Sequence, residues 1–419
     1  MKKRILALLL TVSIVVENGG FVYAAESGSG NTGTEQENIV ESKDEDTSED
    51  ISAGTTNDIE NEEKETEPEK SEPVEQQSTE NPQSADKNVD KSNELSGECG
   101  EHAQWTYDQE TKELRISGSG AMSDYNNSTE VPWYGWREEI QSVVIESGIT
   151  RIGNYAFIYC GGMEEIKLSE GLEIIGNYAF FDCNGIKKVE IPDSVKEIGT
   201  EAFYSCGSLE EVVLGKGLEK VGGETFRYCE KLTKLTIEGN IESIDSSVFY
   251  DTAIKELQVG KGVSSLKETL YGQGVLEKIE VEEGNESYIS EDGVLYNKEK
   301  TTLIRYPQSK SDQTEYKVPE GVKTIGKNAF NGNKTITKIE LPKSVQSIGD
   351  YAFIYCGSME EIKLSEGLEE IGREAFEYCS GIKKAEIPDS VKEIGTEAFY
   401  SCGSLEEVVL GKGLEKVGG

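Results

Sequence analysis

The stretch GNYAFIYCGGMEEIKLSEGLEIIGNYAFFDCNGIKKVEIPDSVKEIGTEAFYSCGSLEEVVLGKGLEKVGG, residues 153–223, decides the fold, because a close copy returns at residues 349–419. Within it a phenylalanine recurs every 23 residues, at Phe157, Phe180 and Phe203, and apolar residues recur at fixed offsets from it. A fixed period of about 20–30 residues is typical of solenoids, in which each coil covers the apolar face of the next. The sequence therefore predicts a stack of coils.

Each coil contains three recognisable segments. The pattern Ile-x-x-Ile-x-Leu predicts a short strand, a Gly- or Pro-containing turn follows, and Val-x-x-Ile-Gly predicts a second extended piece. The segment TEAFYSC, residues 200–206, predicts a compact helical turn. We therefore expect an α/β solenoid with short parallel strands and helical turns. Its coils span residues 140–281 and 318–419, and the second run stops before its last coil is complete, which indicates truncation at the C-terminus.

Two segments precede the repeats and carry no repeat pattern. Residues 1–24 combine Lys2, Lys3 and Arg4 with an apolar run and a Val-Tyr-Ala end, which is typical of a cleaved signal peptide. Residues 25–95 hold no aromatic residue, and residues 26–95 contain 22 acidic and 5 basic residues. Such a composition cannot bury enough apolar surface to offset the ordering entropy. We expect an exported protein with an acidic, disordered linker.

Two further segments depart from the coil pattern. Residues 96–139 alternate Trp105 and Tyr107 with polar residues, which predicts a β cap, and they contain all three tryptophans of the chain. We expect the tryptophans to cover the apolar face of the first coil; the alternative is an exposed aromatic patch that binds carbohydrate or peptide. Residues 282–317 predict a β-hairpin inserted between the two runs of coils.

Seven cysteines occupy one repeat position, three residues after the recurring phenylalanine, as at Cys160, Cys183 and Cys206. Stacked coils place equivalent residues about 4.8 Å apart, but with parallel Cβ directions, which do not suit a disulfide. Thr252 and Asn333 hold the same position in other coils. We therefore expect buried free thiols that pack as small apolar groups, in preference to disulfides or a metal site.

Charged side chains alternate in sign along the predicted exposed face of the strands. The alternation predicts that each strand meets an opposite charge on its neighbour, and our hypothesis is that this ladder sets the register of the coils. The alternative is that the same residues form a binding face. The candidate residues are Glu165, Lys167, Lys188, Glu190, Glu211, Lys234, Lys338, Glu340, Glu361, Lys363, Lys384 and Glu386.

The composition argues against several classes of function. The net charge of −38 leaves no basic footprint for nucleic acid, and no apolar run besides the signal segment suggests membrane insertion. His102 is the only histidine, three residues from Cys99, so a catalytic triad has one possible base. No spacing typical of a zinc site or a phosphate-binding loop occurs. We expect no enzymatic activity, no catalytic residues, no metal and no cofactor.

The repeat φxxIxLPxxVxxIGxxAFxxCxxL, with φ apolar, resembles the leucine-rich repeats of BspA-like bacterial surface proteins. The segment EDGVLYNKEKTTLIRYPQSK resembles an element found between repeats of that family, and GECGEHAQWTYDQETKELRISGSGAM resembles its N-terminal cap. The resemblance covers residues 97–419. It implies extracellular display and, for some members of the family, adhesion to host matrix proteins or other bacteria. We expect a monomeric, secreted or cell-surface protein that binds extracellular proteins or glycans. Two alternatives remain open, namely the targeting portion of a larger exported enzyme and a passive structural stalk.

Overall fold

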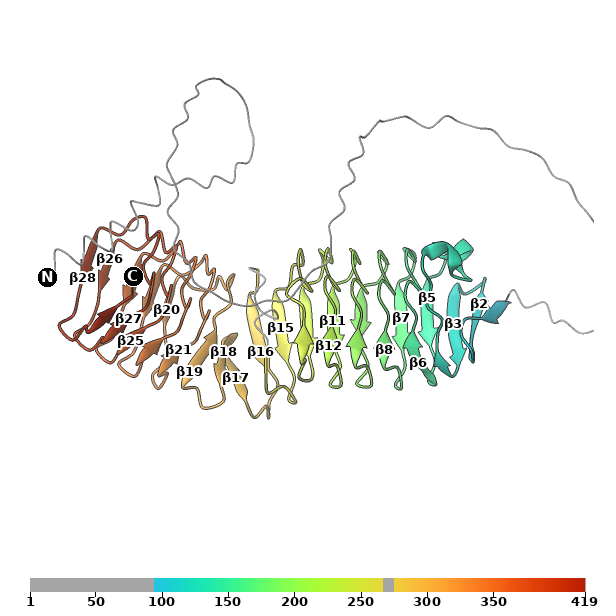
Figure 1. Cartoon of the computed structure of the whole chain (residues 1–419), viewed down its shortest axis with the longest axis horizontal. Helices are drawn as coiled ribbons and strands as arrows, with labels where there is room; N and C mark the ends of the chain where they lie inside the picture. Colours follow the sequence, from blue (N-terminus) through green and yellow to red (C-terminus); the bar gives the residue numbers. More distant parts are fainter. Residues whose placement is uncertain (1–93, 267–274, 419) are drawn as a thin grey trace, which may run out of the picture. The chain divides into compact units, whose positions relative to one another are not determined.

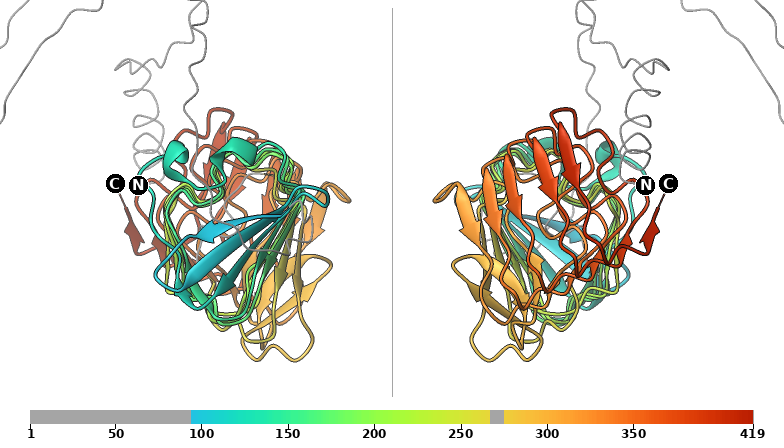
Figure 2. Two further views of the ribbon diagram at one scale, coloured as in Figure 1. Left: turned by 90° about the vertical axis from the view of Figure 1, so that its right-hand side faces the viewer. Right: turned by 90° about the vertical axis from the view of Figure 1, so that its left-hand side faces the viewer.

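The computed structural model describes residues 94–266 and 275–418. The predicted signal peptide lies outside the described residues, and so does the predicted linker except for its last two positions. The described residues form stacked coils, and those of the first array (140–281) overlie one another when viewed end-on (Figures 1 and 2). Every coil has three sides, which we name the long-strand face, the short-strand face and the turn face.

The N-terminal cap is an antiparallel sheet that continues into the coils. Its strands are β1 (Glu94–Glu98), β2 (Ala103–Asp108) and β3 (Glu113–Gly118), and β3 pairs in parallel with the first coil. Two short 3₁₀ helices follow, η1 (Ser128–Glu130) and η2 (Tyr134–Trp136), drawn in teal in Figure 1. Because β1 begins at Glu94, the cap takes in two residues that we assigned to the linker; backbone pairing with β2 orders them despite their acidic surroundings.

The long-strand face carries the three- and four-residue strands, which pair in parallel. In the first array (140–281) they are β5 (Ser142–Ile145), β7 (Glu165–Leu168), β9 (Lys188–Glu190), β11 (Glu211–Leu214), β13 (Lys234–Ile237), β15 (Glu256–Val259) and β16 (Lys278–Val281). In the second array (318–419) and just before it they are β20 (Glu315–Lys317), β22 (Lys338–Glu340), β24 (Glu361–Lys363), β26 (Lys384–Glu386) and β28 (Glu407–Val409). Alternate residues face the core, so the remaining side chains are presented to solvent.

The short-strand face is formed mostly by two-residue strands. They are β4 (Gly120–Ala121), β6 (Ile149–Ile152), β8 (Ile174–Ile175), β10 (Glu197–Ile198), β12 (Lys220–Val221) and β14 (Ser243–Ile244), then β21 (Thr324–Ile325), β23 (Ser347–Ile348), β25 (Glu370–Ile371), β27 (Glu393–Ile394) and β29 (Lys416–Val417). Each pairs in parallel with its equivalent one coil away, as Ile175 does with Ile198. The predicted parallel solenoid is therefore confirmed.

The turn face differs from the predicted helical turn. The described residues contain only η1 and η2 as helices, and both lie in the cap. In the turn, the amides of Tyr155, Phe157 and Tyr159 donate to the carbonyls of Asn177, Ala179 and Phe181 in the next coil, at 2.7–3.0 Å. A helix would direct these N–H groups to carbonyls four residues earlier in the same segment. Tyr155 and Tyr159, four residues apart, have a left-handed backbone, with φ of 60° and 63°.

The recurring phenylalanines form a column through the core, which we call the ladder phenylalanines. In the first array Phe157, Phe180, Phe203, Phe226 and Phe249 are fully buried and stack with ring centroids 5.0–5.6 Å apart. The indole of Trp133 in the cap stacks on Phe157 at 5.4 Å and donates to the Ala156 carbonyl at 3.0 Å. Trp133 therefore occupies the ladder position ahead of the first coil and covers its apolar end.

All eight cysteines are free and buried, as expected for the seven at the repeat position. Six of the seven cysteines at the repeat position donate a hydrogen bond from Sγ to the carbonyl of the ladder phenylalanine one coil earlier. The distance is 3.0 Å from Cys183 to Phe157 and 3.3 Å from Cys206 to Phe180. The thiols thus point to backbone oxygens and not to one another. Asn333 makes the equivalent contact with Pro307 through its amide, which explains why a small polar residue replaces cysteine there.

The inserted element lies between two separate apolar cores. Its strands β17 (Tyr288–Glu291), β18 (Val294–Asn297) and β19 (Thr302–Arg305) pair antiparallel, and β19 then pairs in parallel with β21. Leu295 packs in the core of the first array, while Val294 and Tyr296 pack in that of the second. Tyr306 stacks on Phe330 at 5.1 Å and occupies the ladder position that starts the second array.

Candidate binding surfaces

The structure places the twelve predicted residues on the long-strand face, in two groups. The first group comes from β7, β9, β11 and β13, and the second comes from β22, β24 and β26; β15, β16 and the inserted element separate them in the chain. Where strands of a group are paired, equivalent residues lie directly opposite one another, as Lys188, Glu211 and Lys234 do. The predicted face is therefore two charged patches.

Opposite charges on this face neutralise one another. Glu211 lies 3.5 Å from Lys188 and 3.4 Å from Lys234, and Glu340 lies 3.3 Å from Lys363. The pairing raises the pKa of Lys188, chiefly through its hydrogen bond with Glu190, and lowers the pKa of Glu340, chiefly through its hydrogen bond with Lys363. A partner that covered these patches would have to desolvate ion pairs that are already satisfied.

We expect the Glu211→Lys variant to be destabilised by about 1–2 kcal/mol, because it places three lysines directly opposite one another on adjacent strands. Glu210→Lys makes the same charge change one residue earlier, outside the ladder, and should leave the melting temperature unchanged. Thermal unfolding followed by circular dichroism at low and high salt measures both variants. Equal melting temperatures at low salt would show that the ladder does not contribute to coil register.

A neutral column lies beside the charged one on the same face. This column consists of Val213 on β11, Thr236 on β13 and Gln258 on β15, which pair in register. On β9 and β16 the same column holds charged residues. Val213 and Gln258 are partly exposed, and Thr236 is buried. Our sequence analysis missed this patch because it searched for alternating charge. The signal was the interruption of that alternation after Glu190.

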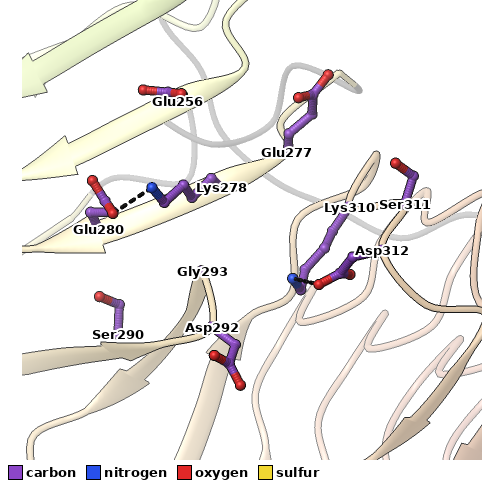
Figure 3. Close-up of a pocket in the computed structure, with 10 residues that line it drawn as sticks. All are labelled: Glu256, Glu277, Lys278, Glu280, Ser290, Asp292, Gly293, Lys310, Ser311 and Asp312. Atoms are coloured by element: carbon purple, nitrogen blue, oxygen red, sulfur yellow. Dashed lines mark hydrogen bonds and ion pairs between the residues drawn. The ribbon is translucent and has the colours of Figure 1, made fainter.

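A pocket of about 540 Å³ lies where β16 meets the inserted element (Figure 3). Its lining is mostly ionic, and its charges are largely paired: Lys278 with Glu280 and Lys310 with Asp312, each at 2.5 Å. Glu277, also in the lining, pairs with Lys255 outside the pocket at 3.0 Å. Among the residues that the structure describes, no group of three or more histidine, cysteine or acidic side chains is arranged to hold a metal ion.

The turn face exposes aromatic side chains that the sequence analysis did not single out. Tyr159, Tyr228, Tyr355 and Tyr378 stand two residues after a ladder phenylalanine and are 37–54% exposed. Each has a left-handed backbone with φ of 56–63°. In other coils the same position holds Asp182, Ser205 or Gly332, which are residue types suited to a turn. That contrast between bulky and small residues at one repeat position was the signal available in the sequence.

The turn face of the second array also holds two nearly buried carboxylates. Glu374 and Glu377 stand where Tyr178 and Phe181 stand in the first copy. Arg373 pairs with Glu374 at 2.5 Å. Burial raises the pKa of Glu377 from its usual 4.5 to about 7, helped by its hydrogen bond with Glu374 and by the charges of Glu374 and Glu397, and opposed by Arg373.

The raised pKa of Glu377 predicts a stability that falls with pH. Because the folded chain holds this proton more tightly than the unfolded chain, the stabilisation is complete below about pH 4.5 and is lost as the pH rises through about 7. We expect Glu377→Gln to stabilise the chain at pH 8 by on the order of 2 kcal/mol and to have little effect at pH 5. Melting temperatures at the two pH values test this. The exposed control Glu360→Gln, outside the charge ladder, should change neither, and an unaltered pH profile in Glu377→Gln would contradict the assignment.

Neither helix among the described residues is long and apolar enough to cross a membrane.

Cys99, in the cap, is buried, and burial raises the pKa of its thiol to about 12, whereas the His102 side chain is 70% exposed. A thiol with so high a pKa is a poor nucleophile at neutral pH.

Several solved structures are similar to the chain. A leucine-rich repeat protein from Eubacterium ventriosum is 25% identical, with a TM-score of 0.47, and the match covers 77% of this chain and 86% of that one. A leucine rich cell surface protein from Faecalibacterium prausnitzii is 24% identical, with a TM-score of 0.47 and coverage of 77% and 94%. The pneumococcal vaccine antigen PcpA is 23% identical, with a TM-score of 0.46 and coverage of 76% and 86%. No curated protein sequence matches the chain.

The repeats themselves match a family model. The model describes the BspA type leucine rich repeat region, and it matches residues 137–280 and 304–419 in six copies. Apart from residue 281, these ranges contain both arrays, with the ladder phenylalanines and the cysteine column, and they leave out most of the inserted element. The chain therefore belongs to the family of BspA-type leucine-rich repeat proteins.

Proposed function

We propose that this protein acts outside the cell as a non-enzymatic binding protein, and that it holds a protein partner on the long-strand face of its first array. Membership of the BspA-type family supports a role in surface recognition. The signal sequence predicted at residues 1–24 supports export, and the acidic segment 25–95 would act as a spacer.

The neutral column on β11, β13 and β15 is the observation that carries this proposal. Protein interfaces are depleted of charge at their centre and polar at their rim. Val213, Thr236 and Gln258 form such a centre, and the paired charges of Glu211 and Lys234 border it in register. A partner covering the column would displace water from neutral groups and leave the ion pairs at the rim.

We also propose that the protein has no catalytic activity. Cys99 lies three residues from His102, the only histidine, and the high pKa of the buried thiol argues against the use of this pair in catalysis. The charged residues that line the 540 Å³ pocket beside β16 are largely ion-paired.

The test uses the Val213→Glu variant. Glu190 and Glu280 hold the same column on β9 and on β16, so the coil accepts glutamate there. Purified chain would be passed over a panel of immobilised extracellular matrix proteins, and Val213→Glu should lose at least roughly tenfold in affinity for the partner that the native chain retains.

Val409 provides the matched control, because it stands at the equivalent position of the second copy and is 39% exposed. Val409→Glu should bind as the native chain does. Equal loss in both variants would contradict a site on the first array. If the native chain, folded by circular dichroism, retained no protein, the passive stalk would be the better account.

A further inference from the structure

A second surface carries an independent inference, on the turn face and not on the strands. We propose that the pocket between the cap and the first two coils binds a sugar ring of a neutral glycan. The pocket measures about 670 Å³ and lies where η1 and η2 meet the turns of those coils. Its side chains include Tyr134, Arg137, Glu138, Tyr159, Asp182 and Asn184.

Tyr159 is the first reason to assign a ligand. The residue is 42% exposed, and its backbone has φ of 63°. A left-handed backbone costs a residue with a Cβ roughly 1–2 kcal/mol, a cost that aspartate offsets by local hydrogen bonds. Asp182 and Ser205 hold this position in the next two coils with φ of 58° and 57°. Because the other coils share this backbone, Tyr159 is distinguished by its exposed side chain in the pocket beside the cap.

Neighbouring rings extend the platform beyond the pocket. Tyr159 meets Phe181 edge-on at 5.9 Å, and Phe181 stacks on Tyr204 at 4.8 Å with the two planes 6° apart. Tyr204 in turn meets Tyr228 at 5.3 Å. Flat aromatic faces bind the apolar C–H faces of sugar rings, while their hydroxyl edges remain wet. Because Phe181 and Tyr204 cover each other's faces, we place the sugar ring on Tyr159 itself.

Polar groups beside Tyr159 are held in place for hydroxyl recognition. Asn184 donates to Asp182 Oδ1 at 2.6 Å, and its own Oδ1 accepts from the Gly207 amide at 3.0 Å. On the other side, Arg137 lies over the Tyr134 ring at 4.2 Å and donates to Glu138 at 3.0 Å. The pocket thus presents fixed donors and acceptors around an aromatic surface, the combination by which pockets orient polar ligands.

Charge and backbone pairing favour a neutral glycan over other occupants. One arginine and two carboxylates line the pocket, and the whole chain has a net charge of −38. An anionic glycan would therefore be repelled. A peptide could not add as a strand here, because the Tyr159 amide already donates to the next coil at 2.8 Å.

The experiment measures binding of the purified chain to an array of neutral oligosaccharides built from hexose and N-acetylhexosamine, with sialylated and uronic-acid glycans alongside. The native chain should retain neutral members. Tyr159→Ser should weaken this binding by roughly tenfold or more. Its melting temperature should be unchanged or raised, because Ser205 shows that the turn accepts serine. Asp182→Ser should also weaken binding.

Tyr355 is the matched control. It holds the equivalent position in the second copy and is 54% exposed, but Tyr134 and Arg137 of the cap have no counterpart there. Tyr355→Ser should bind neutral glycans as the native chain does. The proposal fails if the native chain retains no neutral glycan, if anionic glycans bind more tightly, or if Tyr159→Ser binds as well as the native chain.

A protein partner at this pocket would also overturn the proposal. In that case the chain would still retain the protein after enzymatic removal of its glycans, and Tyr159→Ser would abolish this retention. The outcome is separable from that of the proposed function, because Val213→Glu changes only the long-strand face.

Discussion

Replacing Phe203 by alanine is expected to lower the free energy of unfolding by about 3–5 kcal/mol. Phe203 is fully buried in the middle of the first array, and its ring stacks on Phe180 at 5.0 Å and on Phe226 at 5.4 Å. The backbone of the turn is held by hydrogen bonds to the coils on both sides, so it cannot collapse into the cavity. The variant loses the buried ring and two stacking contacts at once.

Two probes would show how this loss spreads along the stack. All three tryptophans lie in the cap, so their fluorescence reports unfolding at one end, whereas circular dichroism reports all coils. The stability of a repeat array depends on the interfaces between neighbouring coils. When one interface is weakened, the coils on its two sides can unfold at different urea concentrations. We expect coincident urea transitions for the native chain and separated ones for Phe203→Ala.

Phe399→Ala is the control for the contribution of stacking. Phe399 is 7% exposed, and among the described residues it stacks on one phenylalanine only, Phe376. Its loss should be smaller than that of Phe203. Equal losses at the two positions would show that burial alone, without two-sided stacking, determines the effect.

The second large effect is expected for Gly199→Ala, which should destabilise the chain by about 2–4 kcal/mol. A Cβ at Gly199 would lie 2.4 Å from Asn177 Oδ1 and 2.6 Å from the Asn177 nitrogen, on the preceding coil. Asn177 Oδ1 accepts from the Thr200 amide at 2.9 Å, so a methyl group would push this acceptor away and separate the coils. The glycine is required by this close approach, since its φ lies outside the left-handed region.

Gly403→Ala provides the comparison, because a Cβ there would meet nothing within 4 Å. We expect its free energy of unfolding to change by less than about 0.5 kcal/mol, as is usual for surface substitutions. Urea unfolding of both variants measures the difference. A Gly199→Ala variant as stable as the native chain would mean that the coil spacing relaxes without cost.

The candidate surfaces were only partly predictable. Charge alternation located the ladder of Lys188, Glu211 and Lys234, because residues at one repeat position must become neighbours in a solenoid. The pocket beside Tyr159 was not predictable, since η1 and η2 belong to a segment without repeats and nothing in their spacing says which coil they contact. The position of Glu377 was visible, but its raised pKa depends on burial.

The sequence by itself determined the coil period, the residues that form the core, and the columns of phenylalanine, cysteine and alternating charge. It could do so because a 23-residue repeat places equivalent residues of successive coils side by side, so that periodicity reports contacts directly. Only the tertiary structure decided the conformation of the turn face. The segment at residues 200–206 has a composition that permits a helical turn, but hydrogen bonds to the neighbouring coils compete for its amides and prevail. That outcome leaves Tyr159 and its equivalents on the surface in a left-handed backbone, and with them the surface on which we expect a glycan to bind.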